Sequence, residues 1–175
     1  LLIAMPMALV IVSGEIDLSV ASTAGLTSAA MGVLWRDSGL DIGIVIVLSI
    51  LIGVVCGAFN GFLITTLGLP SLAVTIGTLA LYRGLALVVI GDQKVASFPK
   101  ELNAFVLSKI GNTGIPVMMI FVLIVIAFFA VLLHFTPFGR GLYALGYSPQ
   151  AATFVGVRVG HAKFWLFVGT GVVSS

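Results

Sequence analysis

The chain has 175 residues, of which 60% are hydrophobic and only 8% are charged. Soluble domains carry about 25% charged residues, so a water-soluble fold is excluded and we expect lipid around the helices. The net charge is +2 and the basic residues are not clustered, which argues against a nucleic-acid partner. We therefore predict an all-α, polytopic transmembrane helical bundle, a single domain over residues 1–175. Because both ends lie in apolar sequence, we expect a fragment of a longer chain, truncated at both ends.

The first apolar region, residues 1–34, contains a polar interruption. At about 1.5 Å per residue, this region is too long for one straight crossing of a hydrocarbon core roughly 30 Å thick. The interruption holds Gly14 and two acids, Glu15 and Asp17. A charge at this depth costs roughly 2.5–3.5 kcal/mol and usually faces a water-filled cavity or a partner. We predict a broken helix near Gly14, either one tilted crossing or a half-helix followed by a full helix, with a solute path beside it.

A polar segment over residues 35–41 is predicted to end this region, and the next span is expected over residues 42–67. Its glycines recur at steps of four, so they share one helical face on which another backbone can approach closely. These glycines are Gly53, Gly57 and Gly61. The face is either a packing seam alone or a seam beside the solute path that presents Asn60 to it.

The following span, residues 71–90, contains an arginine in its interior. Arg83 at this depth needs an acidic partner, backbone carbonyls or water. We hypothesise that Arg83 pairs with Asp17 or Glu15. The alternative is that its side chain extends to the nearer membrane surface.

The middle of the chain is predicted to leave the membrane and return. Residues 91–114 carry charges and glycines and are expected to form a solvated loop, and residues 115–133 form another span. Counting Lys and Arg does not decide the orientation, because the side that holds residues 135–163 has three and the opposite side has four.

A second polar island, residues 135–163, contains bases but no acid. Serine followed by proline at positions 148 and 149 is typical of a helix start. We predict a short helix over residues 149–155 that ends at Gly156. A last span is expected to begin at residue 164.

Motifs for catalysis, metal binding and nucleotide binding are not found. The chain has no phosphate-binding loop and no zinc-protease motif. His134 and His161 are single and are expected at the membrane surface. We predict no catalytic residue, no metal and no cofactor.

Four segments together resemble one family, the permease subunits of ribose/xylose/rhamnose-type ABC sugar importers. Residues 14–22 (GEIDLSVAS) resemble its GGIDLSVGS signature, and residues 69–84 resemble its PxFIVTLGT…RG segment. Residues 138–146 (FGRGLYALG) resemble FGRxxYAIG, and residues 150–156 (QAATFVG) resemble EAAxxxG. The motifs occur in order and cover nearly the whole chain. Two departures are Glu15 in place of a glycine and Gln150 in place of a glutamate.

The resemblance implies a multi-pass protein of the bacterial cytoplasmic (inner) membrane. It implies a second permease subunit, identical or different, two ATPase subunits that carry the hydrolysis, and an extracytoplasmic sugar-binding protein. The chain itself would not be an enzyme. The resemblance also implies that residues 135–163 are a cytoplasmic coupling loop, with a coupling helix from residue 149. The residues assigned to coupling are Arg140, Gly141, Ala144, Gly146, Gln150, Ala151, Ala152 and Gly156.

A sugar offers hydroxyl groups, so a weakly polar path suits its passage better than a tightly charged site. The residues predicted to line this path are Glu15, Asp17, Ser19, Asn60, Thr75 and Arg83. The substrate would be a monosaccharide, with rhamnose as the specific hypothesis, although autoinducer-2 permeases are also similar. The alternative is an ion-coupled secondary transporter of a small polar solute, in which acids at a broken helix bind the coupling ion.

Overall fold

The computed structural model describes residues 1–92, 104, 106–109, 114–154 and 156–175. Within these ranges the regular structure is helical, apart from an isolated β-bridge between Lys109 and Pro116. The helices are α1 (Ala4–Val12), α2 (Val20–Ser38), α3 (Ile42–Thr65), α4 (Ser71–Ile90), α6 (Val117–Phe135), α7 (Pro137–Tyr147), α8 (Pro149–Phe154) and α9 (Val159–Ser174). The predicted all-α fold is confirmed. Most of the predicted loop over residues 91–114 lies outside the described residues.

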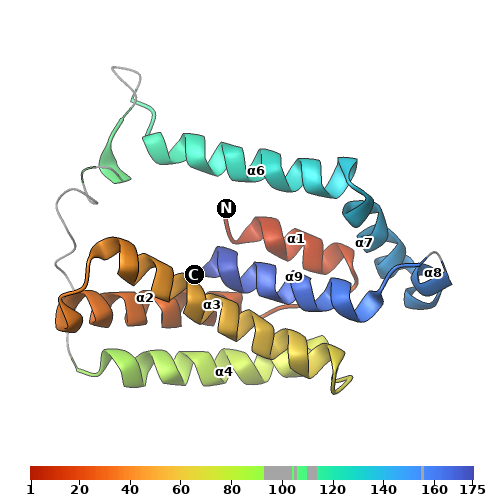
Figure 1. The fold of residues 1–175 in the computed structure, drawn as a ribbon, viewed down its shortest axis with the longest axis horizontal. Helices are drawn as coiled ribbons and strands as arrows, with labels where there is room; N and C mark the ends of the chain where they lie inside the picture. Colours follow the sequence, from red (N-terminus) through yellow and green to blue (C-terminus); the bar gives the residue numbers. More distant parts are fainter. Residues whose placement is uncertain (93–103, 105, 110–113, 155) are drawn as a thin grey trace.

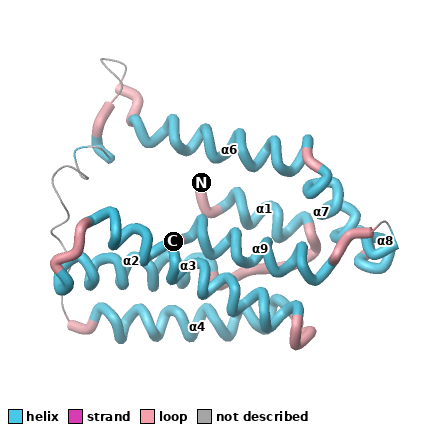
Figure 2. The backbone as a smooth tube through the Cα atoms, in the orientation of Figure 1, coloured by secondary structure: helices cyan, strands magenta, loops and turns pink. Residues whose placement is uncertain are grey.

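The long helices run along a common direction and form a bundle (Figure 1). In this view α6 lies along one side and α4 along the other, with α1, α9, α2 and α3 between them. Helix α9 packs mainly on α3 and also contacts α1 and α2, while α2 packs on α4. Helices α7 and α8 project at one end of the bundle (Figure 2).

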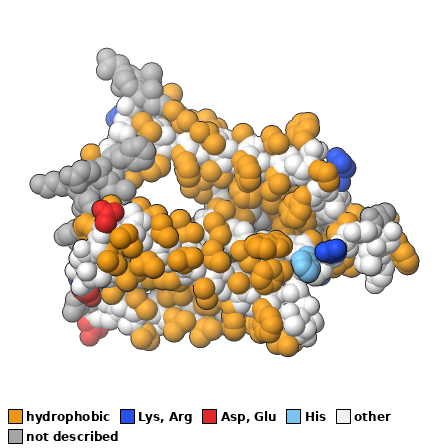
Figure 3. Space-filling view, in the orientation of Figure 1, with side chains coloured by type: hydrophobic (Ala, Val, Ile, Leu, Met, Phe, Trp, Pro, Cys, Tyr) orange, Lys and Arg blue, Asp and Glu red, His pale blue; other side chains and the backbone are white. Residues whose placement is uncertain are grey.

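Three of the described helices, α3, α4 and α6, are long and apolar enough to cross a membrane. Helix α4 has the predicted bounds, while α3 ends two residues early and α6 is shifted by two. No residue of α6 is buried in the bundle. Hydrophobic side chains cover most of the face drawn in Figure 3. An apolar exterior of this kind is what lipid solvates, which confirms the membrane prediction.

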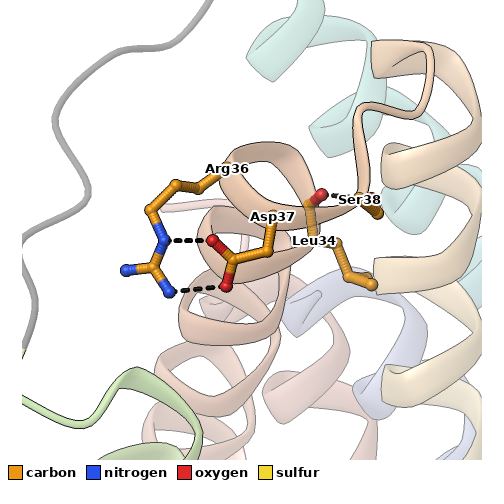
Figure 4. A network of polar contacts seen from close by, with 4 residues as sticks. All are labelled: Leu34, Arg36, Asp37 and Ser38. Carbon is orange, nitrogen blue, oxygen red and sulfur yellow. Dashed lines mark hydrogen bonds and ion pairs between the residues drawn. The ribbon is translucent and has the colours of Figure 1, made fainter.

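The polar segment over residues 35–41 was predicted to end the first region, but α2 continues through most of it. The helix ends at Ser38, before Gly39 in the left-handed conformation at φ 60°. Arg36 donates to both carboxylate oxygens of Asp37, from Nε at 2.5 Å and Nη2 at 2.6 Å (Figure 4). This hydrogen-bonded pair lowers the pKa of the Asp37 carboxyl group. The charged side chains at the end of α2 therefore pair with each other, and the helix continues to Ser38.

The glycine face of α3 lies against α9. A Cβ atom built on Gly53 would be 2.4 Å from the Gly171 carbonyl oxygen, and one built on Gly57 would be 2.3 Å from the Phe167 carbonyl oxygen. A Cβ atom on Gly61 would be 2.9 Å from the Phe164 ring. The two backbones are close enough that only glycine fits at Gly53 and Gly57 without movement.

The second polar island consists of helices rather than an open loop. The Thr136 hydroxyl accepts from the Gly139 N–H at 3.2 Å and caps α7. The Ser148 hydroxyl accepts from the Ala151 N–H at 3.2 Å at the start of α8. The short helix predicted from residue 149 is confirmed as Pro149–Phe154, and Val155 lies outside the described residues. The last span was predicted to begin at residue 164, which is wrong, because α9 begins at Val159.

Candidate functional site

The predicted helix break is present between α1 and α2, and we use "the break" for residues 13–19. Helix α1 ends at Val12, and Gly14 adopts φ 79°, a conformation that favours glycine. The Ser13 hydroxyl donates to the Val10 carbonyl oxygen at 2.7 Å, and the Glu15 N–H donates to the same oxygen at 3.1 Å. The Val10 carbonyl oxygen at the end of α1 therefore has hydrogen-bond donors from the break itself. The chain then continues without helical structure until α2 begins.

Asp17 lies at the centre of the break and is only 3% exposed. Its Oδ1 accepts from the Ser19 N–H at 2.9 Å and from the Ser19 hydroxyl at 2.7 Å. Its Oδ2 accepts from the Thr170 hydroxyl of α9 at 3.0 Å. Both carboxylate oxygens are therefore used inside the protein, one to order the start of α2 and one to attach the break to α9.

The hydrogen bonds continue from the break into α3 and α4. The Asn60 side-chain amide donates to the Ser19 hydroxyl at 2.8 Å. The Tyr82 hydroxyl lies 2.9 Å from the Cys56 carbonyl oxygen and 3.4 Å from Asn60 Oδ1, so it donates to acceptors on α3. A continuous buried network thus connects α9, the break, α3 and α4. We call it the polar junction, and its members are Asp17, Ser19, Asn60, Tyr82 and Thr170.

The first turn of α4 also contacts the break. The Ile16 N–H donates to the Ser71 hydroxyl at 3.2 Å. The Thr75 hydroxyl donates to the Ser71 carbonyl oxygen at 2.8 Å and lies 3.3 Å from the Ile16 carbonyl oxygen. Ser71 therefore fixes the extended backbone of the break to α4, and Thr75 lies directly beside it.

Of the three charged residues predicted to line the path, Glu15 and Arg83 lie outside the polar junction. Glu15 forms an ion pair with Lys163 near the start of α9. Arg83 is exposed and lines a hollow of about 310 Å³ between α2 and α4, with Ala21, Ser22, Gly25, Leu79 and Ala86. Among the described residues Arg83 has no ion-pair partner. The hypothesis that Arg83 pairs with Glu15 or Asp17 is therefore wrong, because Lys163 and hydroxyl groups occupy both acids.

The residues assigned to coupling lie on α7, α8 and the connection to α9. Arg140, Gln150, Ala151 and Gly156 are exposed, Ala152 is buried, and Gly141 and Ala144 are half-buried. Gly146 lies against the break, since a Cβ atom on it would be 2.0 Å from the Val12 carbonyl oxygen. The structure thus brings one assigned coupling residue into direct contact with the end of α1.

Sequence reasoning missed several residues of this site. Thr170 and Ser71 gave no signal, because a single hydroxyl in an apolar helix commonly bonds its own backbone. Tyr147, the last residue of α7, and Phe154, the last residue of α8, are 93% and 91% exposed. An aromatic residue on each side of the short polar segment 148–153 is a pattern that could have indicated an exposed apolar tip.

The arrangement suits reversible hydrogen bonding rather than bond chemistry. No group of three metal-binding side chains occurs in the part of the chain that the structure describes. Asp17, Ser19, Asn60 and Thr75 are each 3% exposed or less. A solute can therefore reach these side chains only if the helices around the polar junction separate.

Comparisons with known proteins identify the family. The family described as "Branched-chain amino acid transport system / permease component" matches residues 1–175. The autoinducer 2 import system permease protein LsrD of Klebsiella pneumoniae is 36% identical over 99% of this chain and 53% of its own length. The proteins of the same name from Enterobacter sp. and Escherichia coli are 34% and 35% identical over 99% of this chain and 54% of their own length. No solved structure matches.

The chain spans about half the length of the curated relatives it matches. The family match confirms the resemblance to ABC importer permeases that the four sequence motifs indicated. The apolar helices and the bacterial relatives also confirm the predicted location in the inner membrane. This multi-pass membrane chain belongs to the branched-chain amino acid transport system / permease component family.

Proposed function

We propose that this chain forms part of the membrane-spanning permease subunit of an ABC importer, which carries a small polyhydroxylated solute into the cell. The solute is a monosaccharide, with rhamnose as one candidate, or autoinducer 2, which the relatives' names specify. The partners are a second permease subunit, ATPase subunits that hydrolyse ATP, and an extracytoplasmic binding protein that delivers the solute. The chain itself performs no catalysis.

The observation that carries this proposal is the polar junction at the helix break. Irregular backbone at membrane depth is tolerated where it is buried in protein or lines a cavity. Here the break is surrounded by hydroxyl and amide groups of three other segments. Such groups can exchange their partners for the hydroxyls of a passing solute at little net cost in hydrogen bonds. The junction therefore supports a path for a neutral polar solute.

Arg83 supplies the second part of the proposed path. Its guanidinium group has five N–H donors and no acceptor, and it lies in a hollow of about 310 Å³. A Cβ atom built on Gly25 of this hollow meets nothing within 4 Å, so the space beside the arginine is open. We propose that Arg83 donates hydrogen bonds to solute hydroxyls after the solute enters the membrane.

Helix α8 is the proposed contact with the ATPase. Its Gln150 and Ala151 are exposed, and the exposed Phe154 follows on the same short helix. A polar helix with one exposed aromatic side chain can dock in a groove of a partner through that anchor. Movement of the ATPase would then reach the membrane helices through α7 and α9.

Transport in proteoliposomes tests the proposal. The full-length permease is reconstituted with its ATPase and binding protein, and uptake of labelled rhamnose, ribose and autoinducer 2 is measured separately. We expect uptake of one of these solutes that requires ATP and the binding protein and persists without an ion gradient. Uptake that follows a proton or sodium gradient and ignores ATP would overturn the proposal in favour of a secondary transporter.

A further inference from the structure

Both helices that flank α8 contact the break. Helix α7 precedes α8, and its Gly146 lies so near α1 that a Cβ atom would be 2.0 Å from the Val12 carbonyl oxygen. Helix α9 follows α8, and its Lys163 forms the ion pair with Glu15. Helix α8 is therefore joined to the break on one side by a backbone contact and on the other by an ion pair.

The extended part of the break runs alongside α9 in the same direction. Residues two apart in an extended chain point to the same side, as Glu15 and Asp17 do here. Lys163 and Thr170 are seven apart, which is about two helical turns and one face of α9. Glu15 contacts Lys163 and Asp17 contacts Thr170. The side chains of Glu15 and Asp17 thus attach the break to one face of α9. In Figure 2 the connection between α1 and α2 and helix α9 both run from the end near α8 toward the opposite end.

These two attachments differ in chemistry. The Asp17 contact is with a neutral hydroxyl that also lies 2.8 Å from the Phe167 carbonyl oxygen, so it has an alternative acceptor. The Glu15 contact joins two opposite charges whose side chains are only 12% and 20% exposed. Separating opposite charges at a partly buried position is strongly unfavourable, because each is left without its partner. The ion pair is therefore the attachment that should persist while the helices move.

We propose that Glu15 and Lys163 are a positioning pair that makes the break move together with α9 when α8 is displaced. This inference rests on the proposed function. Because the pair holds, movement of α9 carries residues 15–17 with it, and the Ser19–Asn60 hydrogen bond to α3 must then open. Without the pair, α9 could slide along the glycine face of α3 while the break stays in place. ATP hydrolysis would then continue without opening the path.

Charge exchange provides the first test, in proteoliposomes that hold the full-length permease, its ATPase and its binding protein. The quantity measured is the number of solute molecules taken up per ATP hydrolysed. We expect Glu15→Lys and Lys163→Glu each to lower this ratio by roughly tenfold, a typical size for coupling between sites, with ATP hydrolysis retained. The double exchange should restore most of the ratio.

The matched control is the other ion pair, Arg36–Asp37, which is exposed at the opposite end of α2. Arg36→Asp, Asp37→Arg and their combination should leave the ratio unchanged. If the Glu15 and Lys163 single variants instead lose uptake and ATP hydrolysis in equal proportion, the pair has only a structural role and the proposal is overturned. Lack of rescue by the double exchange in a protein of normal melting temperature would also overturn it.

A reversible bridge provides the second test. In a Cys56→Ala background, Glu15→Cys and Lys163→Cys are joined by a short reducible bis-methanethiosulfonate reagent. Because the two positions are proposed to move as a unit, the bridged protein should retain coupled uptake, and reduction of the bridge should uncouple it. Loss of uptake on bridging would show that the two positions separate during transport and would overturn the proposal. The bridging yield reports their contact directly, so it stays informative even if uptake by the natural protein follows an ion gradient, which would contradict the proposed function alone.

Discussion

At the scale of single residues, the polar junction depends on the hydrogen bonds that the buried Asp17 carboxylate accepts. Three donors surround its carboxyl group, and two of them come from Ser19. In the described residues no buried side-chain nitrogen or oxygen atom lacks a hydrogen-bond partner. A complete network of this kind favours one arrangement of the helices, because removing any member leaves another polar group unpaired.

Replacing Asp17 by alanine should therefore destabilise the protein. The Ser19 N–H and hydroxyl would lose their acceptor inside the bundle, whereas the Thr170 hydroxyl keeps the Phe167 carbonyl oxygen. An unsatisfied buried polar group costs about 1–3 kcal/mol. We expect Asp17→Ala to lower the melting temperature in detergent clearly. The matched control is Asp37→Ala, since Asp37 is exposed and its removal should change the melting temperature little. Equal effects of the two substitutions would contradict the role given to the network.

The sequence predicted much of this site but not its connections. Asp17, Ser19, Asn60 and Thr75 are polar groups in apolar surroundings, and the structure brings them together around the break. Thr170 contacts Asp17 from 153 positions away, which no local pattern specifies. The error over Arg83 also has a geometric cause. Adjacent residues of a helix do not share a face, so with Tyr82 directed into the junction, Arg83 points away from it.

At the scale of the helices, the close approach of α3 and α9 depends on glycine. Membrane helices associate through packing and small residues rather than through a hydrophobic driving force. Gly57 lies at the centre of this contact, where a Cβ atom would be 2.3 Å from the Phe167 carbonyl oxygen and 2.9 Å from the Val168 Cα atom. Both of these atoms belong to the backbone, so a clash cannot be relieved by a side-chain rotation.

Alanine at this position should separate α3 from α9. Overpacking of a tight interface typically costs about 1–3 kcal/mol, so we expect Gly57→Ala to lower the melting temperature of the purified protein. Gly77→Ala on α4 is the control, because a Cβ atom there meets nothing within 4 Å. A stable Gly57→Ala protein with full activity would show that the two helices can move apart freely.

The close contact between α7 and α1 also depends on a glycine, Gly146, and we predict that enlarging this residue impairs ATP-driven uptake. Gly146→Ala would push α7 away from the Val12 carbonyl oxygen and should reduce ATP-driven uptake by roughly tenfold through a strain of about 1–3 kcal/mol. Gly160→Ala at the start of α9 is the control, because a Cβ atom there meets nothing within 4 Å. Uptake measured in the same proteoliposomes should remain near normal for Gly160→Ala. Similar losses for both variants would mean that the contact between α7 and α1 has no special role in coupling.

Helix limits were predictable where composition changes sharply and not where it changes gradually. Helix α4 begins after Pro70 and ends before Gly91, which fixes both limits in the sequence. Helix α9 begins five residues before the predicted position, because Lys163 pairs with Glu15 inside the bundle and need not lie in water. A helix end predicted from the polarity of the sequence is therefore wrong when a charged side chain pairs with a residue far away in the sequence.

At the scale of the whole molecule, charge is distributed unequally between the two ends. On the face drawn in Figure 3, basic side chains lie near α7 and α8, and Asp and Glu side chains lie at the opposite end together with a further basic side chain. Counting bases in the sequence did not decide the orientation, and part of the loop that raises the count at the acidic end lies outside the described residues. The proposed coupling to an ATPase requires that α8 face the cytoplasm.

Cysteine labelling provides a direct test of this orientation. Cys56 is buried and is the single cysteine of the 175 residues, so the background is Cys56→Ala with every cysteine of the remaining permease also replaced. Ser38→Cys at the end of α2 and Gln150→Cys on α8 are both at exposed positions and lie at opposite ends of the bundle (Figure 1). In right-side-out membrane vesicles, a membrane-impermeant maleimide should label Ser38→Cys, whereas Gln150→Cys should react only in inside-out vesicles. Labelling of Gln150→Cys from the outside would place α8 beyond the reach of a cytoplasmic ATPase and would remove the physical basis for coupling through α7 and α9.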